Sequence, residues 1–405
     1  MKNKLNQHKI KPLITSMLCL FLFLFLFSTT GMAQVKSGKS KTISIPFEAS
    51  RWDTSKQHAE FITYKNVKAM KIVRGKNGNN QVILKDFNFT NGTIEFDTQP
   101  VDGSRPSFMS VYFRQQNPSE SEIVYLRTRP DESQQRNDGI QYAPILHGIN
   151  LWDIYGQFQA SAPIKNDDWN HFKLVISGLQ MKVYLNNMER PVLQIPRLEG
   201  ESHAGTIAFD GPAYFANLTV KPNETEELSP EEGVDLTNHD INYIRRWDVS
   251  ASQFLESGRE LIIKDLPTDT TKWKPILAER RGLVNLSRVF GGLDNRGGGV
   301  QNKNRYVWLK TTIHSTKEQI ARIQLGFSDE VYVFINRGLL YVDKNQYPQP
   351  IRKYPDGRLD IANSAFDIPL KAGDNELIIG VSNYFYGWGI VARMQNMDGI
   401  TVLQQ

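Results

Sequence analysis

The chain has 405 residues, a formal net charge of +5 and 40% hydrophobic residues. This length predicts two or three domains, and this composition excludes a wholly disordered chain. The net positive charge does not indicate a nucleic-acid-binding protein, because the basic residues are not clustered in one stretch of the sequence.

The first 33 residues have the organisation of a secretory signal peptide. Four lysines among the first eleven residues precede an unbroken apolar run over residues 17–27, and small residues at Gly31 and Ala33 form a cleavage site. The run is shorter than the ~20 residues that a membrane-spanning helix needs. We predict cleavage after Ala33 and a secreted or periplasmic bacterial protein with no transmembrane anchor; an uncleaved anchor is the alternative.

Removal of this leader changes the chemistry of the chain. The leader holds four of the net positive charges, so the mature chain is nearly neutral. It also holds Cys19, the only cysteine. The mature protein therefore has no disulfide, no thiol nucleophile and no thiolate metal site, and its stability depends on packing.

An acidic segment divides the mature chain. Residues 222–240 contain seven acidic residues and no basic residue, together with Pro222, Pro230 and Gly233. This composition is typical of a solvated linker. We predict a first domain over residues 43–221, an acidic linker over 222–244 and a second domain over 245–405.

Both halves have the pattern of β-structure. Residues 108–114 and 123–127 alternate between apolar and polar side chains, and Asn91-Gly92 is a strong hairpin signal. In the second half the predicted strands cover residues 306–313, 322–327, 331–335, 376–382 and 389–394. Because no helical segments separate them, we expect an all-β protein of two antiparallel β-sandwich (jelly-roll) domains.

The first half resembles a known family. Tyr125-Leu126-Arg127-Thr128-Arg129-Pro130, Trp169-Asn170-His171-Phe172-Lys173 and Tyr214-Phe215-Ala216-Asn217-Leu218 follow in order. This series is similar to the concanavalin A-like lectin/glucanase jelly roll, and most similar to its 3-keto-disaccharide hydrolase-like group. The resemblance implies a laminin-G-like fold rather than a particular activity.

The second half resembles the galactose-binding-like jelly roll found beside many glycosidases. Residues 328–338 fit its "acidic residue, strand, Asn-x-Gly turn" element, and residues 370–377 fit its "Leu-Lys-x-Gly-x-Asn-x-Leu" turn. The resemblance implies sugar binding or packing against a neighbouring domain. Tyr384, Tyr386 and Trp388 follow a strand there; they are either a sugar platform or part of the core.

The catalytic motif of laminarinase-type glucanases is incomplete. That motif is Glu-x-Asp-x-x-Glu on one strand, and its carboxylates act as nucleophile, helper and acid/base. The best match begins at Glu95 and Asp97, but Pro100 replaces the third carboxylate. This mechanism is therefore not supported, and we interpret Glu95 and Asp97 as polar residues of a strand face.

Aromatic and arginine side chains share the second face of the first-half strands. Rings stack on the C–H faces of sugars, while arginine, glutamine and aspartate bind hydroxyl groups. If these strands are neighbours, the face binds a carbohydrate; burial under a covering loop is the alternative. The predicted ligand-binding residues are Tyr112, Arg114, Tyr125, Arg127, Gln141, Tyr142, His147, Trp152 and Tyr155.

Three acidic residues near this face, Glu122, Asp138 and Asp153, are the candidates for a catalytic carboxylate. No cofactor motif is present, and the seven histidines never pair at zinc-ligand spacing. A structural calcium ion held by loop oxygen atoms remains open.

Three functions fit these observations. The leading hypothesis is a secreted, largely non-catalytic protein that binds carbohydrate through two β-sandwich modules. The alternatives are hydrolysis of a glycosidic or 3-keto-glycosidic bond by the first domain, and a structural or adhesion protein of the cell envelope. The sequence does not name the sugar, the linkage or the oligomeric state.

Overall fold

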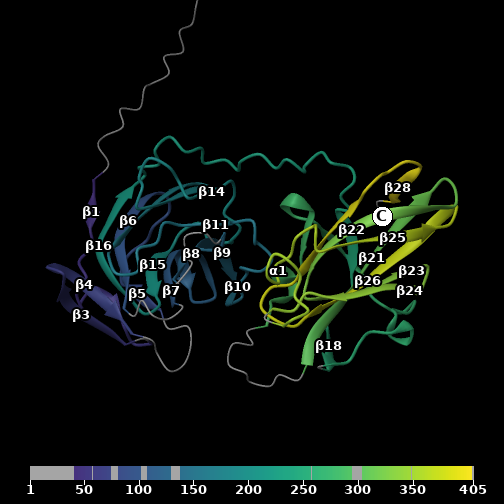
Figure 1. Ribbon diagram of the computed structural model, residues 1–405, viewed down its shortest axis with the longest axis horizontal. Coiled ribbons are helices and arrows are strands. Elements are labelled where there is room, and N and C mark those ends of the chain that lie inside the picture. The colour runs from purple at the N-terminus through teal and green to yellow at the C-terminus, as the bar shows by residue number, and fades with distance from the viewer. Residues whose placement is uncertain are drawn as a thin grey trace, which may run out of the picture. The chain divides into compact units, whose positions relative to one another are not determined.

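The computed structural model describes residues 41–403, except residues 57, 74–80, 102–106, 129–136, 257, 294–302 and 348. The predicted signal peptide lies outside the described residues. Ser40–Gln405 forms one compact unit, built almost entirely of antiparallel β-strands (Figure 1). The predicted all-β fold class is confirmed. Among the described residues, no helix is long and apolar enough to cross a bilayer.

The first sandwich consists of two eight-stranded sheets. The first sheet has the order β14-β13-β12-β6-β16-β4-β3, with β1 beside β16, and the second has the order β10-β9-β8-β7-β15-β5-β2, with β11 beside β9. The strands of the first sheet are β1 (Ile43–Ser44), β3 (Ala59–Tyr64), β4 (Val67–Ile72), β6 (Gly92–Pro100), β12 (Asn170–Ser177), β13 (Gln180–Leu185), β14 (Leu193–Ile195) and β16 (Ala213–Pro222). Those of the second sheet are β2 (Trp52–Asp53), β5 (Val82–Leu84), β7 (Ser107–Asn117), β8 (Glu120–Thr128), β9 (Ile140–Leu146), β10 (Ile149–Asn150), β11 (Gln159–Ala160) and β15 (Thr206–Asp210).

The second sandwich pairs an eight-stranded sheet with a four-stranded one. The third sheet has the order β19-β17-β21-β26-β23-β24, with β18 and β28 beside β21, and the fourth has the order β20-β27-β22-β25. The third sheet contains β17 (Arg246–Val249), β18 (Gln253–Glu256), β19 (Lys274–Leu277), β21 (Lys303–Ser315), β23 (Glu330–Ile335), β24 (Gly338–Lys344), β26 (Gly373–Asn383) and β28 (Ile400–Leu403). The fourth contains β20 (Leu283–Asn285), β22 (Gln319–Ser328), β25 (Ser364–Leu370) and β27 (Gly389–Met394). The helical elements are α1 (Leu286–Phe290), η1 (Ile263–Asp265) and η2 (Arg280–Gly282).

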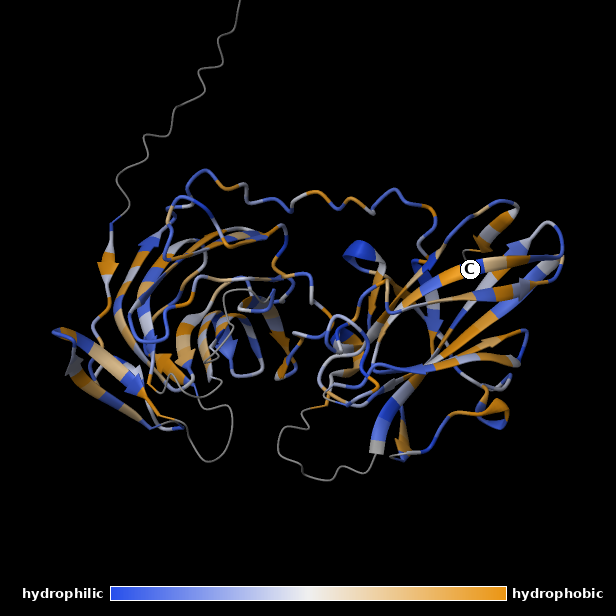
Figure 2. Ribbon diagram, in the orientation of Figure 1, coloured by the Kyte–Doolittle hydropathy of each residue, from blue (hydrophilic) through white to orange (hydrophobic). Residues whose placement is uncertain are grey.

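Alternating hydropathy directs one face of each strand into a core. Many strands carry orange and blue bands in turn along their length (Figure 2). In the first sandwich, the rings of Phe96 and Phe209, from opposite sheets, meet edge to face with centroids 5.0 Å apart. The core cluster of the first sandwich also includes Leu283, Leu359 and Tyr386 of the second sandwich. Apolar packing is therefore continuous from one sandwich into the other.

After Pro222, the last residue of β16, the acidic segment contains no strand, and it contacts the first sandwich. The backbone carbonyl of Pro230 accepts a hydrogen bond from the Leu179 N–H at 2.8 Å, and the Gly233 N–H donates to Pro196 at 2.7 Å. Lys173 forms an ion pair with Glu226 at 2.8 Å. These contacts hold the segment against the sheet instead of leaving it free in solvent.

Candidate functional site

Side chains of β8 and β9 form a hydrogen-bonded group on the face opposite to Val124 and Leu126. The Tyr125 hydroxyl donates to Gln141 Oε1 at 3.1 Å, and Arg127 Nη2 donates to the Tyr125 hydroxyl at 3.1 Å. Gln141 Nε2 in turn donates to the backbone carbonyl of Trp152 at 2.7 Å. The group thus brings together four of the predicted ligand-binding residues: Tyr125, Arg127, Gln141 and Trp152.

The second sandwich covers this face. The ring of Trp152 meets the edges of Tyr347 and Tyr386, with centroids 5.0 Å and 6.2 Å away. The carboxylate of Asp153 accepts a hydrogen bond from the Gly387 N–H at 3.0 Å. Because of this cover, Tyr125 is only 3% exposed. Among the described residues, the predicted face is therefore largely an internal surface.

A cavity of about 670 Å³ lies beside this face. We call it the Arg358 pocket; its lining residues are Asn137, Asp138, Gln159, Arg352, Lys353, Tyr354, Pro355, Asp356 and Arg358. Its volume is in the range of pockets that bind small molecules. Asp138, one of the predicted carboxylates, lines it, and its backbone carbonyl accepts a hydrogen bond from Arg127 Nη1 at 2.8 Å. Arg127 therefore connects the polar group on β8 and β9 to the wall of the pocket.

Arg358 lies between the pocket and Trp152. Its guanidinium lies over the Trp152 ring, 4.9 Å from the centroid, and the residue is only 3% exposed. Among the described residues, its Nε has no hydrogen-bond partner. Burial, followed by the positive charge of Arg127, lowers the pKa of Arg358 below the usual value for arginine. The pocket therefore contains a buried cation with unused hydrogen-bonding capacity.

Arg114 does not share the face of Tyr125, contrary to the alternation of the sequence. Its φ is 51°, and the pairing of β7 with β8 shifts register after Phe113. This bulge interrupts the alternation. The guanidinium donates to the Thr90 carbonyl at 2.8 Å, just before β6, and to the Gly178 carbonyl at 2.9 Å, between β12 and β13. Arg114 is therefore a buried link between the two sheets.

Tyr142 and Glu122 also lie away from the Arg358 pocket. The Tyr142 hydroxyl donates to Glu122 Oε2 at 2.8 Å, and the Gly200 N–H donates to Glu122 Oε1 at 3.2 Å. Burial raises the pKa of Glu122 to about 7. A Cβ at Gly200 would lie 2.5 Å from Glu122 Oε1, so only glycine fits above this carboxyl group. Glu122 does not line the Arg358 pocket, and its contacts hold the loop at Gly200.

Two further predicted residues are fully enclosed. Tyr112 is 4% exposed and belongs to the core cluster of the first sandwich. Asp153 is 2% exposed, and burial followed by the charge of Asp329 raises its pKa well above the usual range. Neither residue lines the Arg358 pocket.

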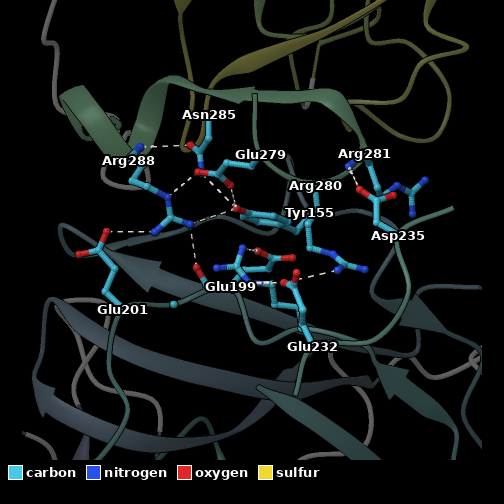
Figure 3. Close-up of polar contacts among 12 residues, drawn as sticks. Tyr155, Glu199, Glu201, Glu232, Asp235, Glu279, Arg280, Arg281, Asn285 and Arg288 are labelled. Atoms are coloured by element: carbon cyan, nitrogen blue, oxygen red, sulfur yellow. Dashed lines mark hydrogen bonds and ion pairs between the residues drawn. The ribbon is translucent and has the colours of Figure 1, made fainter. Parts of the chain in front are cut away.

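A second polar cluster contains Tyr155 (Figure 3). The Tyr155 hydroxyl donates to Glu279 Oε2 at 2.8 Å and accepts from Asn285 Nδ2 at 3.1 Å. Arg288 contacts Glu279 through Nε and donates from Nη2 to the backbone carbonyl of Glu199 at 2.9 Å. These hydrogen bonds join the first sandwich to β20, α1 and the residues before them. His147 is nearby at an exposed position, with Nε2 3.0 Å from the Arg288 carbonyl oxygen.

Glu199 and Glu279 of this cluster line a smaller cavity of about 340 Å³. Burial raises the pKa of Glu199 to about 7, although Arg197, with Nη1 3.5 Å from Glu199 Oε2, opposes the shift. Glu279 forms an ion pair with Arg288. One carboxyl group of this cavity thus has a raised pKa, while the other is paired with a positive charge.

The aromatic residues of the second half are not an exposed platform. Trp388 is fully buried, and its Nε1–H donates to the Gly291 carbonyl at 2.8 Å. Tyr386 packs against Trp152 and is 7% exposed. Both residues are therefore packed inside the protein, as the alternative interpretation of this segment stated.

Glu95 and Asp97 belong to a polar group on the first sheet. His171 Nδ1 lies 2.6 Å from Asp97 Oδ1, and Lys221 forms an ion pair with Glu95 at 2.8 Å. A hydrogen bond from His171 to Asp97 raises the pKa of the imidazole. In the part of the chain that the structure describes, no group of three or more His, Cys, Asp or Glu residues is arranged to hold a metal ion. A structural calcium ion remains a prediction.

The sequence did not indicate the second-half residues of the Arg358 pocket. Tyr354, Pro355, Asp356 and Gly357 have the composition of a turn, and an isolated arginine after a turn carries no signal for a ligand site. Only the packing of this turn beside Asp138 makes Arg358 part of a pocket.

One family model matches the first sandwich. Residues 47–221 match the family model of the 3-keto-alpha-glucoside-1,2-lyase-like domain. The match confirms the predicted resemblance of this half, whereas the galactose-binding-like resemblance of the second half stays a prediction. No curated protein matches the chain.

Several solved structures are similar to part of the chain. The carbohydrate-binding module CBM66 from Bacillus subtilis is 16% identical, with 42% of this chain and 94% of that chain covered and a TM-score of 0.32. A beta-glucanase of Bacillus licheniformis is 8% identical, with 46% and 100% covered and a TM-score of 0.30. The galectin LEC-6 of Caenorhabditis elegans is 14% identical, with 36% and 99% covered and a TM-score of 0.24. Because these TM-scores are low, no ligand or activity is transferred from them.

Proposed function

We propose that this is a secreted carbohydrate-binding protein whose ligand site is the Arg358 pocket. The observation that carries the proposal is the buried Arg358 guanidinium, which lines a cavity of about 670 Å³ and has an Nε without a partner among the described residues. Asp138, Asn137 and Gln159 add acceptors and donors around the same cavity. Such a mixture of donors and acceptors matches the hydroxyl groups of a sugar.

An aromatic ring at the pocket supports the same function. Tyr354 lines the cavity and is 83% exposed, which is unusual for a large ring. An exposed ring beside polar groups offers a stacking surface for the C–H face of a pyranose. Protein sites for small ligands commonly combine such an apolar surface with a few polar groups that fix orientation.

Binding to a glycan array tests this proposal. We expect the full chain to bind a subset of glycans and Tyr354→Ala to weaken that binding by about tenfold, equivalent to the loss of one good contact. Phe254→Ala is the matched control, because Phe254 is 64% exposed and lies outside the pocket. Absence of glycan binding, or equal loss in both variants, would overturn the proposal.

A second candidate function is cleavage of a glycosidic bond, and the family match over residues 47–221 favours it. The described carboxyl groups best placed for it are Glu199, whose pKa burial raises to about 7, and Glu279, which is paired with Arg288. Two carboxyl groups in different environments are the usual pair in glycoside hydrolysis. Sugar release from 3-keto-disaccharides by the wild type, lost in Glu199→Gln, would support an enzyme.

Stable binding of another envelope protein, insensitive to added sugar, would instead support an adhesion role.

A further inference from the structure

Arg358 has too little negative charge around it for a buried cation. Its single ion pair among the described residues joins Nη1 to Asp356 Oδ2 at 3.8 Å. The other oxygen of Asp356 is already held by Arg352, at 2.8 Å from Nε. A buried charge normally needs a close, hydrogen-bonded partner of opposite sign. The carboxylate nearest to Arg358 is therefore both distant and shared.

The surrounding charges increase this imbalance. Three cationic side chains, Arg352, Lys353 and Arg358, line the pocket against two acidic ones. Lys353 forms an ion pair at 2.7 Å with Asp343, which does not line the pocket. Arg127, behind the wall, adds a positive charge close enough to lower the pKa of Arg358. With Arg127 and Asp343 included, four cationic side chains stand against three acidic ones, among them Asp138, whose negative charge also acts on Arg358. One positive charge is thus left for an anion to balance.

The guanidinium of Arg358 is also held in place before any ligand arrives. It stacks on Trp152 with 4.9 Å between the guanidinium carbon and the ring centroid. The stem passes over Gly156, where an added Cβ would lie 2.8 Å from Arg358 Cδ. Since packing already orders this long side chain, a ligand does not bear the cost of ordering it.

We propose that the Arg358 pocket binds the carboxylate group of a uronic acid within a larger glycan. This inference rests on the proposed carbohydrate-binding function and names its ligand class. A planar carboxylate matches the fork of an arginine side chain and forms two parallel hydrogen bonds with it. It would accept hydrogen bonds from the terminal nitrogens of the guanidinium and supply negative charge beside it, while the neighbouring hydroxyl groups meet Asp138 and Asn137.

Calorimetric titration of the full chain with four probes tests the inference. The uronic-acid probes are oligogalacturonides and glucuronic-acid-containing oligosaccharides; the other two are the carboxyl-reduced form of the oligogalacturonides and sulfated oligosaccharides of similar length. We expect at least one uronic-acid probe to bind about tenfold or more tightly than the reduced probe, with an affinity that falls as salt is added. This comparison needs no variant, so it does not depend on how Arg358 substitutions fold.

Variants then assign the effect to one side chain. Arg358→Lys keeps the charge but loses the fork and the stacking, and we expect it to remove most of the preference for the uronic-acid form. Arg322→Lys is the matched control, because Arg322 is 47% exposed and pairs with Asp367 at 2.8 Å on the second sandwich. Thermal unfolding of each variant shows whether it is folded.

The outcomes distinguish failure of the uronic-acid inference from failure of the carbohydrate-binding function on which it rests. Equal binding of uronic-acid and reduced probes overturns the inference and leaves carbohydrate binding intact. Preference for the sulfated probe alone overturns the carboxylate assignment. If no glycan of any charge binds, the proposed function itself is lost.

Discussion

The carboxylate of Asp153 in the first sandwich accepts a hydrogen bond from the Gly387 N–H of the second sandwich at 3.0 Å. A Cβ at Gly387 would lie 2.6 Å from Asp153 Oδ1 and 3.2 Å from Leu151 Cδ2. The two segments thus approach so closely that the glycine has no room for a side chain. On the other side of the same loop, Asp329 Oδ2 accepts from the Tyr384 N–H at 2.6 Å and the Phe385 N–H at 2.9 Å.

Substitution of Gly387 by alanine should therefore destabilise the protein. We expect Gly387→Ala to lower the free energy of unfolding by about 1–3 kcal/mol, the usual cost of overpacking. Gly338→Ala is the control, because a Cβ there would meet only the Ile335 carbonyl oxygen at 3.5 Å. Urea denaturation measures both. If Gly387→Ala is as stable as the control, the segments of Asp153 and Gly387 can move apart to admit the methyl group without a loss of unfolding free energy.

The alternation of the sequence predicted the strands well, because a period of two is a local property of the backbone. It correctly placed Val124 and Leu126 on the face of the strand opposite to Tyr125 and Arg127. It failed at Arg114, since a β-bulge depends on the pairing of two strands and has no marker in the sequence here. Arg358 was beyond prediction for a related reason: its role depends on packing between segments that are far apart in the chain.

The geometry of Arg114 leads to a stability prediction. Its Nε and Nη2 bond the carbonyls of Thr90 and Gly178, and Nη2 also bonds Asn91 Oδ1 at 2.9 Å. A lysine has one ammonium group and cannot reach all three acceptors. We expect Arg114→Lys to cost about 2–4 kcal/mol of unfolding free energy, because buried acceptors lose their donors.

The control for Arg114→Lys is the same substitution at Arg322. That side chain is 47% exposed, and an exposed ion pair contributes about 1 kcal/mol or less. Chemical denaturation should place Arg322→Lys close to the wild type. Equal stability of the two variants would show that the contacts of Arg114 with the first sheet do not contribute to folding.

The buried carboxyl groups predict how stability depends on pH. Burial raises the pKa values of Glu122, Glu199 and Asp329 to about 7 in the folded chain. In the unfolded chain such groups titrate near pH 4, so unfolding releases their protons between about pH 4 and 7. Rising pH in this window should therefore lower stability, by up to about 3–4 kcal/mol for each group.

Thermal unfolding between pH 4.5 and 8 checks this dependence. The melting temperature should fall as the pH rises towards 7, and Glu199→Gln should flatten part of the slope because the amide cannot ionise. Glu201→Gln is the control, since Glu201 is 54% exposed. A melting temperature that rises steadily over this range would contradict the raised pKa values.

Trp152 connects the packing of the two sandwiches to the ligand pocket. Its ring contacts Tyr347 and Tyr386 and lies under the guanidinium of Arg358. We expect Trp152→Ala to cost about 3–5 kcal/mol, as for other large-to-small substitutions in a core, and also to weaken glycan binding because Arg358 loses the surface that orders it. Trp152→Phe keeps a ring beneath the guanidinium and should retain most of both properties. If Trp152→Ala remains folded and binds glycan as tightly as the wild type, stacking on Trp152 is not what orders Arg358.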